Sequence, residues 1–218
     1  MSRLARLDAP GVLHHVMGRG IEGNDIFQSV TDCQDFVDRL NKLAIKGAFD
    51  VYAWTLMPNH FHLLVKTPEA NISRSMRHLN GVYTQRYNSR HKCDGQLFRG
   101  RYKSILTDTD SYLLQAVRYI HRNPLGAGLA AKLDAYKWSS HKGYISIAKK
   151  WDWLHKNYIL SLLSKNRNAW LRYYKKWVSV EGKDKVSEKI SGKKWPACIG
   201  PQSFVDRIKE AYGAEKIN

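Results

Sequence analysis

The stretch Val51-Tyr-Ala-Trp-Thr-Leu-Met-Pro-Asn-His-Phe-His-Leu-Leu-Val65 reads as two apolar strands joined by a turn. The Pro-Asn pair in its middle is typical turn chemistry, so we expect a β-hairpin with strands at 49–57 and 61–66. Successive side chains of a strand point to opposite faces, which puts His60 and His62 on one face. Two imidazoles in this arrangement can share one metal ion. The hairpin therefore predicts a candidate site as well as a fold.

The segments around this hairpin alternate between strand and helix patterns. Val12–Met17, followed by a Gly-Arg-Gly turn, and Tyr102–Thr107 predict two further strands. Apolar residues at helical spacing predict three helices: one capped by Thr31-Asp32 and ended by Gly47, one over Ile72–Arg90, and one over Ser111–Asn123 that Pro124 stops. The order of the first six elements matches a split βαβ, ferredoxin-like unit. We therefore expect an α+β fold whose antiparallel sheet has helices on one face, while the other face carries a site or a further helix.

The chain changes character after about residue 148. We assign residues 1–148 to a domain that carries the motifs described here, and residues 149–218 to a basic, mostly helical C-terminal extension. Within the extension we expect helices over 158–177 and 203–212, and a solvated loop over the Lys/Gly-rich segment 182–194. Such an extension would grip a polyanionic partner or brace the rest of the protein.

Charge favours a nucleic-acid partner. The 36 Lys and Arg residues exceed the 19 Asp and Glu residues by 17, and the sequence pI is about 9.8. Aromatic residues accompany this charge, and unpaired bases stack on aromatic faces while phosphates pair with Arg and Lys. No apolar stretch approaches the ~20 residues of a membrane span, and the three scattered cysteines fit a reducing cytoplasm.

The helix predicted at 112–123 carries a second group of polar residues. At 100° per residue, one stripe of this helix holds Tyr112, Gln115, Tyr119 and Asn123. Tyr119 and Asn123 are four residues apart, so their side chains lie one turn from each other. An amphipathic helix with a half-buried tyrosine and a C-terminal asparagine cap is the alternative interpretation.

Together, the two histidines and this stripe suggest phosphoryl transfer. A divalent metal held by two imidazoles and an amide oxygen keeps positions open for a phosphate and can withdraw charge from its oxygens. A tyrosine is then a suitable nucleophile, and its phosphotyrosine ester stores the bond energy for a later attack by a hydroxyl. Such chemistry suits DNA strand transfer.

Three motifs closely resemble the REP-associated tyrosine transposases, relatives of the single-tyrosine HUH insertion-sequence transposases. They are Met57-Pro-Asn-His-Phe-His-Leu-Leu-Val65, Gly95-Gln-Leu-Phe-Arg-Gly-Arg-Tyr-Lys-Ser104 and Arg118-Tyr-Ile-His-Arg-Asn-Pro-Leu-Gly-Ala-Gly-Leu129. The resemblance covers about residues 8–145, and the motifs occur in the expected order. It makes residues 1–148 a catalytic domain with His60-Phe61-His62 as its HUH motif.

The resemblance implies a role for each site residue. Tyr119 is the nucleophile, His60 and His62 are metal ligands, and Asn123 stands where the insertion-sequence branch has a glutamine as third ligand. It further implies Mg²⁺ or Mn²⁺ and no nucleotide cofactor. The implied substrate is single-stranded DNA beside an imperfect, REP-like hairpin, cleaved site-specifically through a 5′-phosphotyrosine. We expect a monomer, although insertion-sequence relatives act as dimers that exchange the tyrosine helix.

The basic segment at 99–103 is the predicted DNA contact. Arg99, Arg101 and Lys103 would follow the phosphates, with Tyr102 as an aromatic in their middle, and Arg19 is another candidate contact. We leave His14, His15 and His121 outside the predicted site.

Two other functions compete with a nicking and joining enzyme. The first is a hairpin-binding regulator of the same fold that no longer cleaves DNA. The second is an RNA-binding ferredoxin-like module, which would need exposed aromatics on its central strands, such as Tyr52 and Trp54. That module would leave the paired histidines without a purpose.

Overall fold

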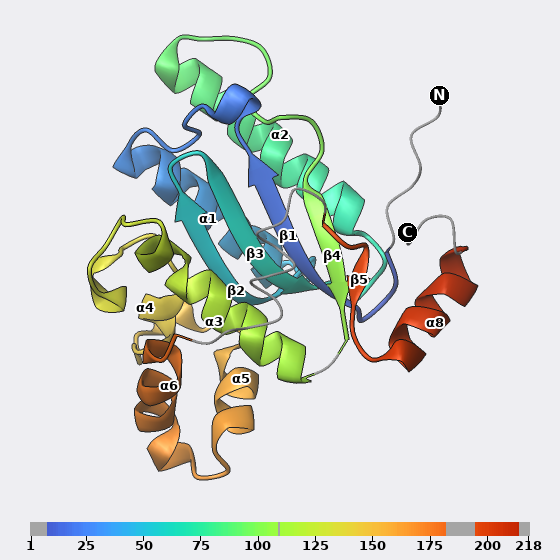
Figure 1. The fold of residues 1–218 in the computed structure, drawn as a ribbon. Coiled ribbons are helices and arrows are strands. Elements are labelled where there is room, and N and C mark those ends of the chain that lie inside the picture. Colours follow the sequence, from blue (N-terminus) through green and yellow to red (C-terminus); the bar gives the residue numbers. More distant parts are fainter. Residues whose placement is uncertain (1–7, 109, 182–194, 214–218) are drawn as a thin grey trace.

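The computed structural model describes residues 8–108, 110–181 and 195–213, and its centre is a five-stranded sheet (Figure 1). The strand order is β2-β3-β1-β4-β5. The strands are β1 (Leu13–Arg19), β2 (Asp50–Met57), β3 (His60–Lys66), β4 (Lys103–Thr107) and β5 (Cys198–Ile199). The first four pair antiparallel, as predicted, whereas β5 adds a short parallel strand beyond β4.

Helices cover both faces of the sheet. One face packs against α1 (Val30–Ile45) and α2 (Ile72–His91), and the other against α3 (Asp110–Gly126). The order β1-α1-β2-β3-α2-β4 confirms the ferredoxin-like α+β fold. The other helices of the described residues are α4 (His141–Tyr144), α5 (Lys156–Leu163), α6 (Trp170–Ser179) and α8 (Gln202–Tyr212). Turns of 3₁₀ helix lie at Ile21–Gly23, Leu133–Ala135, Lys149–Trp151 and Arg167–Ala169.

The helix boundaries differ from the sequence predictions at three places. The cap of α1 is Ser29, not Thr31-Asp32: the Ser29 hydroxyl accepts a hydrogen bond from the Asp32 N–H, and the Asp32 carboxylate accepts one from the Ser29 N–H. This reciprocal pair is a capping box. Asp32 therefore acts from the third helical position.

Pro124 does not stop α3, which continues to Gly126. The helix ends instead where Gly128 takes a left-handed φ of 69°. Its N–H donates to the Leu125 carbonyl, and the Leu129 N–H donates to the Pro124 carbonyl. These two bonds form a Schellman motif, which satisfies the last carbonyls of the helix.

The helix predicted over 158–177 is two helices, α5 and α6, which lie side by side (Figure 1). Ser164 and Asn166 interrupt it, because their side chains accept hydrogen bonds from backbone N–H groups two residues later, at Asn166 and Asn168. Short polar side chains that bond the nearby backbone favour turns over helix. The predicted loop at 182–194 lies outside the described residues.

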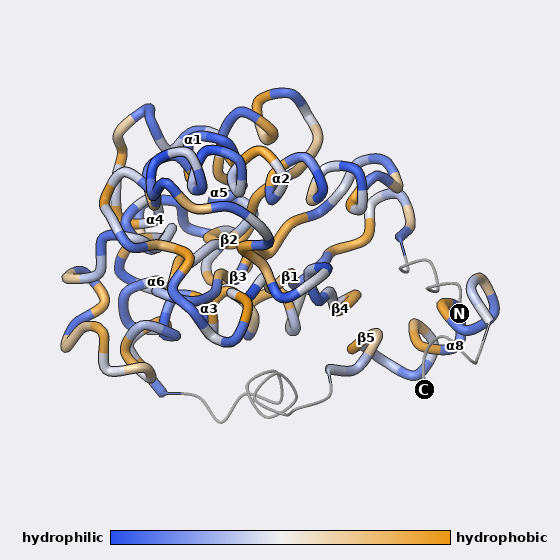
Figure 2. The backbone as a smooth tube through the Cα atoms, turned by 90° about the horizontal axis from the view of Figure 1, so that it is seen from above, coloured by the Kyte–Doolittle hydropathy of each residue, from blue (hydrophilic) through white to orange (hydrophobic). Residues whose placement is uncertain are grey.

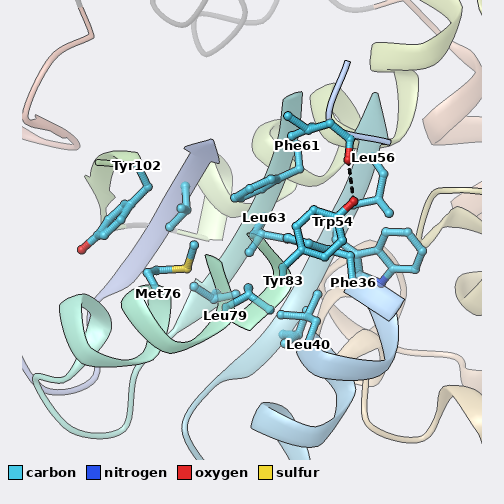
Figure 3. Close-up of a cluster of buried hydrophobic side chains, with 14 of the residues drawn as sticks. Phe36, Leu40, Trp54, Leu56, Phe61, Leu63, Met76, Leu79, Tyr83 and Tyr102 are labelled. Atoms are coloured by element: carbon cyan, nitrogen blue, oxygen red, sulfur yellow. Dashed lines mark hydrogen bonds between the residues drawn. The ribbon is translucent and has the colours of Figure 1, made fainter. Parts of the chain in front are cut away.

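Hydrophobic residues line the central strands (Figure 2). On the α1/α2 side, Phe61 is fully buried, with its ring centroid 4.8 Å from that of Phe36 (Figure 3). On the other side, Leu64 packs with α3. This alternation leaves His60 and His62 on one face, as predicted, and that is the face on which α3 packs. Within the described residues no helix is long and apolar enough to cross a membrane.

Gly18 lies opposite Phe61 in the β1–β3 pairing, and a Cβ at Gly18 would lie 2.5 Å from a Phe61 ring carbon. We expect Gly18→Ala to lower the free energy of unfolding by about 1–3 kcal/mol because the buried ring must shift. Urea unfolding measures this change. Phe61→Leu in the same chain should recover part of the loss, since it removes the clash.

Gly126→Ala is the control for this prediction, because no heavy atom lies within 4 Å of a Cβ built at Gly126. Stability there should be unchanged or rise by up to about 1 kcal/mol. An equal loss at both glycines would show that the close approach to Phe61 is not the cause.

Candidate functional site

His60 and His62 lie at the start of β3 with their ring centroids 5.2 Å apart. Each ring has its Nδ1 engaged: His60 Nδ1 is 2.7 Å from Asn59 Oδ1, and His62 Nδ1 is 2.9 Å from His15 Nε2. In the described part of the chain, no hydrogen bond engages either Nε2 atom. A metal-binding histidine commonly has this arrangement, with one nitrogen held by a partner and the other available to the metal.

The histidines of this site are held neutral. Burial lowers the pKa of His60 to about 4, and the Arg19 guanidinium adds to the shift. Burial also lowers the pKa of His62 well below its usual value, with His15 and His60 acting in the same direction. Only the neutral form of a histidine ligates a metal. The site therefore presents ligand-competent imidazoles at neutral pH.

The tyrosine helix brings Tyr119 to these histidines. The apolar side of α3, with Ala116, Val117 and Ile120, is buried against the sheet. The Tyr119 ring then meets His62 edge-on, with centroids 5.6 Å apart and planes at 89°. The two groups of residues that the sequence analysis combined are thus adjacent in space.

Asn123 lies one turn after Tyr119 and is hydrogen-bonded to it. Burial raises the pKa of the Tyr119 phenol above its usual value, and the hydrogen bond with Asn123 opposes that shift. The described residues contain no cluster of three or more His, Cys, Asp or Glu that could hold a metal. A metal here would combine the two imidazoles with oxygen ligands, for which an asparagine amide is chemically suited.

Of the predicted DNA contacts, Arg19 lies next to this site. Arg19 is exposed and pairs in register with His60 across β1 and β3. The Arg99 N–H donates to the Arg19 carbonyl at 2.8 Å, so the loop at 95–102 is attached to the same end of the sheet. The side chains of Arg99, Arg101 and Lys103 are exposed. Tyr102 differs, since it is buried with its hydroxyl 3.2 Å from the Ser73 hydroxyl.

Sequence reasoning missed His15. Its Nε2 contacts His62 Nδ1, and its ring centroid lies 5.9 Å from that of Tyr119. Burial lowers the pKa of His15 to about 3. A signal was present, because pairing β1 with β3 in the observed register makes His15 a diagonal neighbour of His62 on the same face.

Trp195 is the second residue that the sequence analysis missed. Its ring stacks on His62, with centroids 6.2 Å apart and planes at 18°, and the Lys103 ammonium lies 5.8 Å from its centroid. It precedes β5, whose pairing with β4 carries this part of the chain to the site. No feature of the sequence around Trp195 indicated this position.

His121 lies outside the site, as predicted, in a buried network that holds α3. Its ring contacts the Ser140 hydroxyl at 2.7 Å and the Tyr174 hydroxyl at 2.9 Å. The Tyr174 hydroxyl also contacts His141, which in turn contacts the Asp134 carboxylate at 2.7 Å. A fully hydrogen-bonded buried network rigidifies the elements that it joins. It therefore fixes the helix that carries Tyr119.

Tyr52 and Trp54 are both buried, with 7% and 1% of their surfaces exposed. Bases can stack only on accessible rings. The central strands therefore do not offer these two aromatics to RNA.

This chain is similar to a known protein family and to solved structures. A family model described as "Transposase IS200 like" matches residues 12–123, which include His60, His62, Tyr119 and Asn123. A REP-associated tyrosine transposase bound to a REP hairpin is similar in fold, with 18% identity, a TM-score of 0.53, and coverage of 66% of this chain and 85% of that chain. A candidate transposase from Deinococcus radiodurans R1 has 20% identity, a TM-score of 0.39, and coverage of 56% and 97%. No curated protein matches.

Proposed function

Because this chain belongs to the IS200-like transposase family, we propose that it is a metal-dependent, site-specific enzyme that nicks and joins single-stranded DNA beside hairpins. The observation that carries the proposal is the contact between Tyr119 on α3 and His62 on β3. A candidate nucleophile and candidate metal ligands from distant parts of the chain meet on one face of the sheet. The net charge of +17 fits a DNA substrate.

The proposed reaction is an exchange of phosphodiester bonds. The Tyr119 hydroxyl oxygen attacks a phosphorus of the single strand, the bond from that phosphorus to the 3′ oxygen breaks, and a 5′-phosphotyrosine forms. The phenol loses its proton, and the departing 3′ oxygen gains one. A 3′-hydroxyl later attacks the phosphotyrosine, which rejoins DNA and restores the tyrosine.

The donor set fits a Mg²⁺ or Mn²⁺ ion held by His60, His62 and the Asn123 amide oxygen. When bound, the ion would withdraw charge from the phosphate oxygens. The hydrogen bond from Asn123 lowers the pKa of the Tyr119 phenol, as expected for an amide N–H donating to the phenol oxygen. The amide nitrogen would then support the nucleophile while its oxygen is directed to the metal.

We propose a monomer as the active unit, in which α3 packs on the sheet of its own chain.

The proposal is tested by capture of the covalent intermediate. The protein is incubated with Mn²⁺ and end-labelled single strands that contain REP-like hairpins with randomised flanks, and then denatured. We expect a labelled protein–DNA adduct that survives denaturation. Hairpin binding without an adduct across the whole library would contradict cleavage and favour the non-cleaving regulator.

His15 gives a further prediction, since it is the partner that orients His62. His15→Phe keeps an aromatic ring in this buried position but removes the nitrogen that contacts His62. We expect the affinity for Mn²⁺ without DNA to fall about 10- to 100-fold, as measured by calorimetry. His15→Gln, whose amide can still contact His62 Nδ1, should retain more affinity. Equal affinities in the wild type and His15→Phe would exclude the orienting role.

A further inference from the structure

Tyr174 on α6 is a fully buried tyrosine whose hydroxyl ties the C-terminal extension to the tyrosine helix. This hydroxyl lies 2.9 Å from Nδ1 of His121 on α3 and 2.7 Å from Nδ1 of His141 on α4. Both α4 and α6 lie beside α3 (Figure 1). No step of the proposed reaction uses the hydroxyl, so its two contacts need another explanation.

The two contacts belong to a longer chain of hydrogen bonds that runs from the protein surface to β2. At the surface, the Asp134 carboxylate lies 2.7 Å from His141 Nε2, and 65% of the Asp134 side chain is exposed. At the inner end, His121 Nε2 lies 2.7 Å from the Ser140 hydroxyl. The same hydroxyl accepts a hydrogen bond from the Trp54 N–H on β2 at 2.9 Å. The chain therefore joins α6, α4 and α3 to the sheet.

The surface end gives this chain a direction. An ionised carboxylate only accepts hydrogen bonds, and a neutral imidazole has one donor and one acceptor nitrogen. Asp134 thus requires a proton on His141 Nε2, which leaves His141 Nδ1 to accept from the Tyr174 hydroxyl. Since Tyr174 gives its one proton to His141, it accepts from His121 Nδ1. His121 Nε2 then accepts from the Ser140 hydroxyl.

The ionisation states that this direction requires are present at neutral pH. Burial lowers the pKa of His121 well below its usual value. Burial also lowers the pKa of His141, although the Asp134 carboxylate opposes that shift. The hydrogen bond from His141 holds the pKa of Asp134 below its usual value, so Asp134 is ionised. Two neutral imidazoles therefore stand between an anion and the Ser140 hydroxyl.

The same atoms also permit the opposite direction. The Ser140 hydroxyl lies 3.2 Å from a carbonyl of β2, so it can donate there and accept from His121 Nε2. The α6 hydroxyl would then donate to His121 Nδ1 and accept from His141 Nδ1. His141 Nε2 would carry no proton for the Asp134 carboxylate, which would lose its hydrogen bond. The carboxylate therefore selects one of two directions.

This chain fixes the rotation of α3 about its own axis. Two residues of a helix are separated by about 200°, so His121 and Tyr119 lie on nearly opposite sides of α3. The Tyr119 ring meets its neighbours His62 and His15 edge-on, without a directional bond of this kind. A turn of about 10° moves a group at the ~6 Å outer radius of a helix by about 1 Å. A misplacement of this size can slow a reaction about 100-fold.

Arg122 forms a second connection between α3 and α6. Its guanidinium donates hydrogen bonds to the carbonyls of Val178 and Ser179, at 3.2 and 2.7 Å, where α6 ends. A cation is favourable at this end of a helix dipole. Arg122 is partly exposed, whereas Tyr174 is fully buried, so α6 is held to α3 both inside the protein and at its surface.

We propose that Tyr174 is a positioning residue for Tyr119, which sets the rotation of α3 through His121 in a hydrogen-bond chain whose direction Asp134 determines. The extension thereby braces the tyrosine helix. The consequence for DNA cleavage rests on the proposed function. The tautomers of the histidines and the placement of Tyr119 do not depend on it.

The test compares Tyr174→Phe with Tyr144→Phe in the full-length protein. Each substitution removes one buried hydroxyl from the same cluster, where the two rings stack with centroids 5.0 Å apart. The Tyr144 hydroxyl donates to the Tyr52 carbonyl at 2.8 Å and lies outside the chain. Both variants should lose stability, but only Tyr174→Phe should break the chain.

The ¹⁵N shifts of the histidine rings measure the direction of the chain without DNA. In the wild type we expect a proton on Nδ1 of His121 and on Nε2 of His141. Tyr174→Phe should move the His121 proton to Nε2, where Ser140 can accept it. Asp134→Leu, at an exposed position that should not disturb folding, should reverse both tautomers and keep the chain intact.

Nuclear Overhauser effects between the rings of Tyr119 and His62 measure the placement of α3, again without DNA. We expect them to weaken in Tyr174→Phe and to persist in Tyr144→Phe. Adduct formation per folded molecule should slow about 10- to 100-fold in Tyr174→Phe. Hairpin affinity should stay within about twofold of the wild type, so the loss appears in the rate and not in binding. Tyr144→Phe should form the adduct at the wild-type rate.

Two results would overturn the proposal in separate parts. A proton on Nε2 of His121 in the wild type, or unchanged tautomers in Asp134→Leu, would exclude the assigned direction. A wild-type ring contact and adduct rate in Tyr174→Phe, or equal slowing in Tyr144→Phe, would exclude the positioning role and leave only a contribution to stability. If the wild type itself formed no adduct, the proposed function would fail, and the tautomers and ring contacts would still decide this inference.

Discussion

Tyr119→Phe is expected to reduce the covalent protein–DNA adduct by about a thousandfold or more, while the affinity for hairpin DNA stays close to that of the wild type. The substitution removes only the hydroxyl oxygen that would attack phosphorus. The ring that packs edge-on against His62 and near His15 remains, so α3 should keep its position. Denaturing gels measure the adduct, and fluorescence anisotropy measures binding.

Tyr112→Phe is the matched control, because Tyr112 is a partly buried tyrosine about two turns earlier on the same stripe of α3. It should form the adduct at the wild-type level. An adduct that persists in Tyr119→Phe but disappears in Tyr112→Phe would move the nucleophile to Tyr112. Loss of hairpin binding in Tyr119→Phe would indicate that the phenol has a structural role.

The sheet face that carries the site could be predicted because strand periodicity is a local property. Alternation along 51–65 separates Phe61 from His60 and His62, and the apolar stripe of 112–123 fixes which side of α3 meets the sheet. When that apolar stripe packs on the sheet face that carries the histidines, the adjoining Tyr119 is placed close to them. Two local patterns were therefore sufficient to bring these residues together.

Residues whose position depends on distant pairing were missed. His15 contacts His62 because β1 lies between β3 and β4 in one register, and that register is a tertiary property. Trp195 reaches His62 only because the chain returns to the edge of β4 as a two-residue strand, which is too short to show periodicity. The Arg99–Lys103 segment shows the same limit, since its charges could be read from the sequence but the burial of Tyr102 could not.

Errors at helix ends had a different cause. Ser29, Thr31 and Asp32 are all good cap residues, and only the backbone geometry selects Ser29. Pro124 is a strong stop signal, yet the helix continues past it to the turn at Gly128. There the N–H groups of Gly128 and Leu129 bond to the carbonyls of Leu125 and Pro124, which are among the last of the helix. Competing local signals of similar strength are decided by the rest of the fold.

His60→Ala is expected to weaken Mn²⁺ binding by more than about 100-fold and to remove the adduct, whereas hairpin binding should persist. It deletes one imidazole of the candidate metal site. His60 is only partly buried, so the substitution should disturb the core less than a change at the buried His62. Calorimetry with Mn²⁺ measures the metal affinity. In the wild type, a chelator should abolish the adduct and added Mn²⁺ should restore it.

His78→Ala is the control for the loss of a histidine that does not belong to the site, because His78 is exposed on α2. It measures any binding of Mn²⁺ to histidines elsewhere on the surface. It should match the wild type in metal affinity and in adduct formation. If His60→Ala still bound Mn²⁺ normally but lost the adduct, His60 would act on the DNA and not on the metal. If the chelator left the wild-type adduct intact, the reaction would need no metal, and the neutral His60–His62 pair would instead serve as hydrogen-bonding groups for the phosphate.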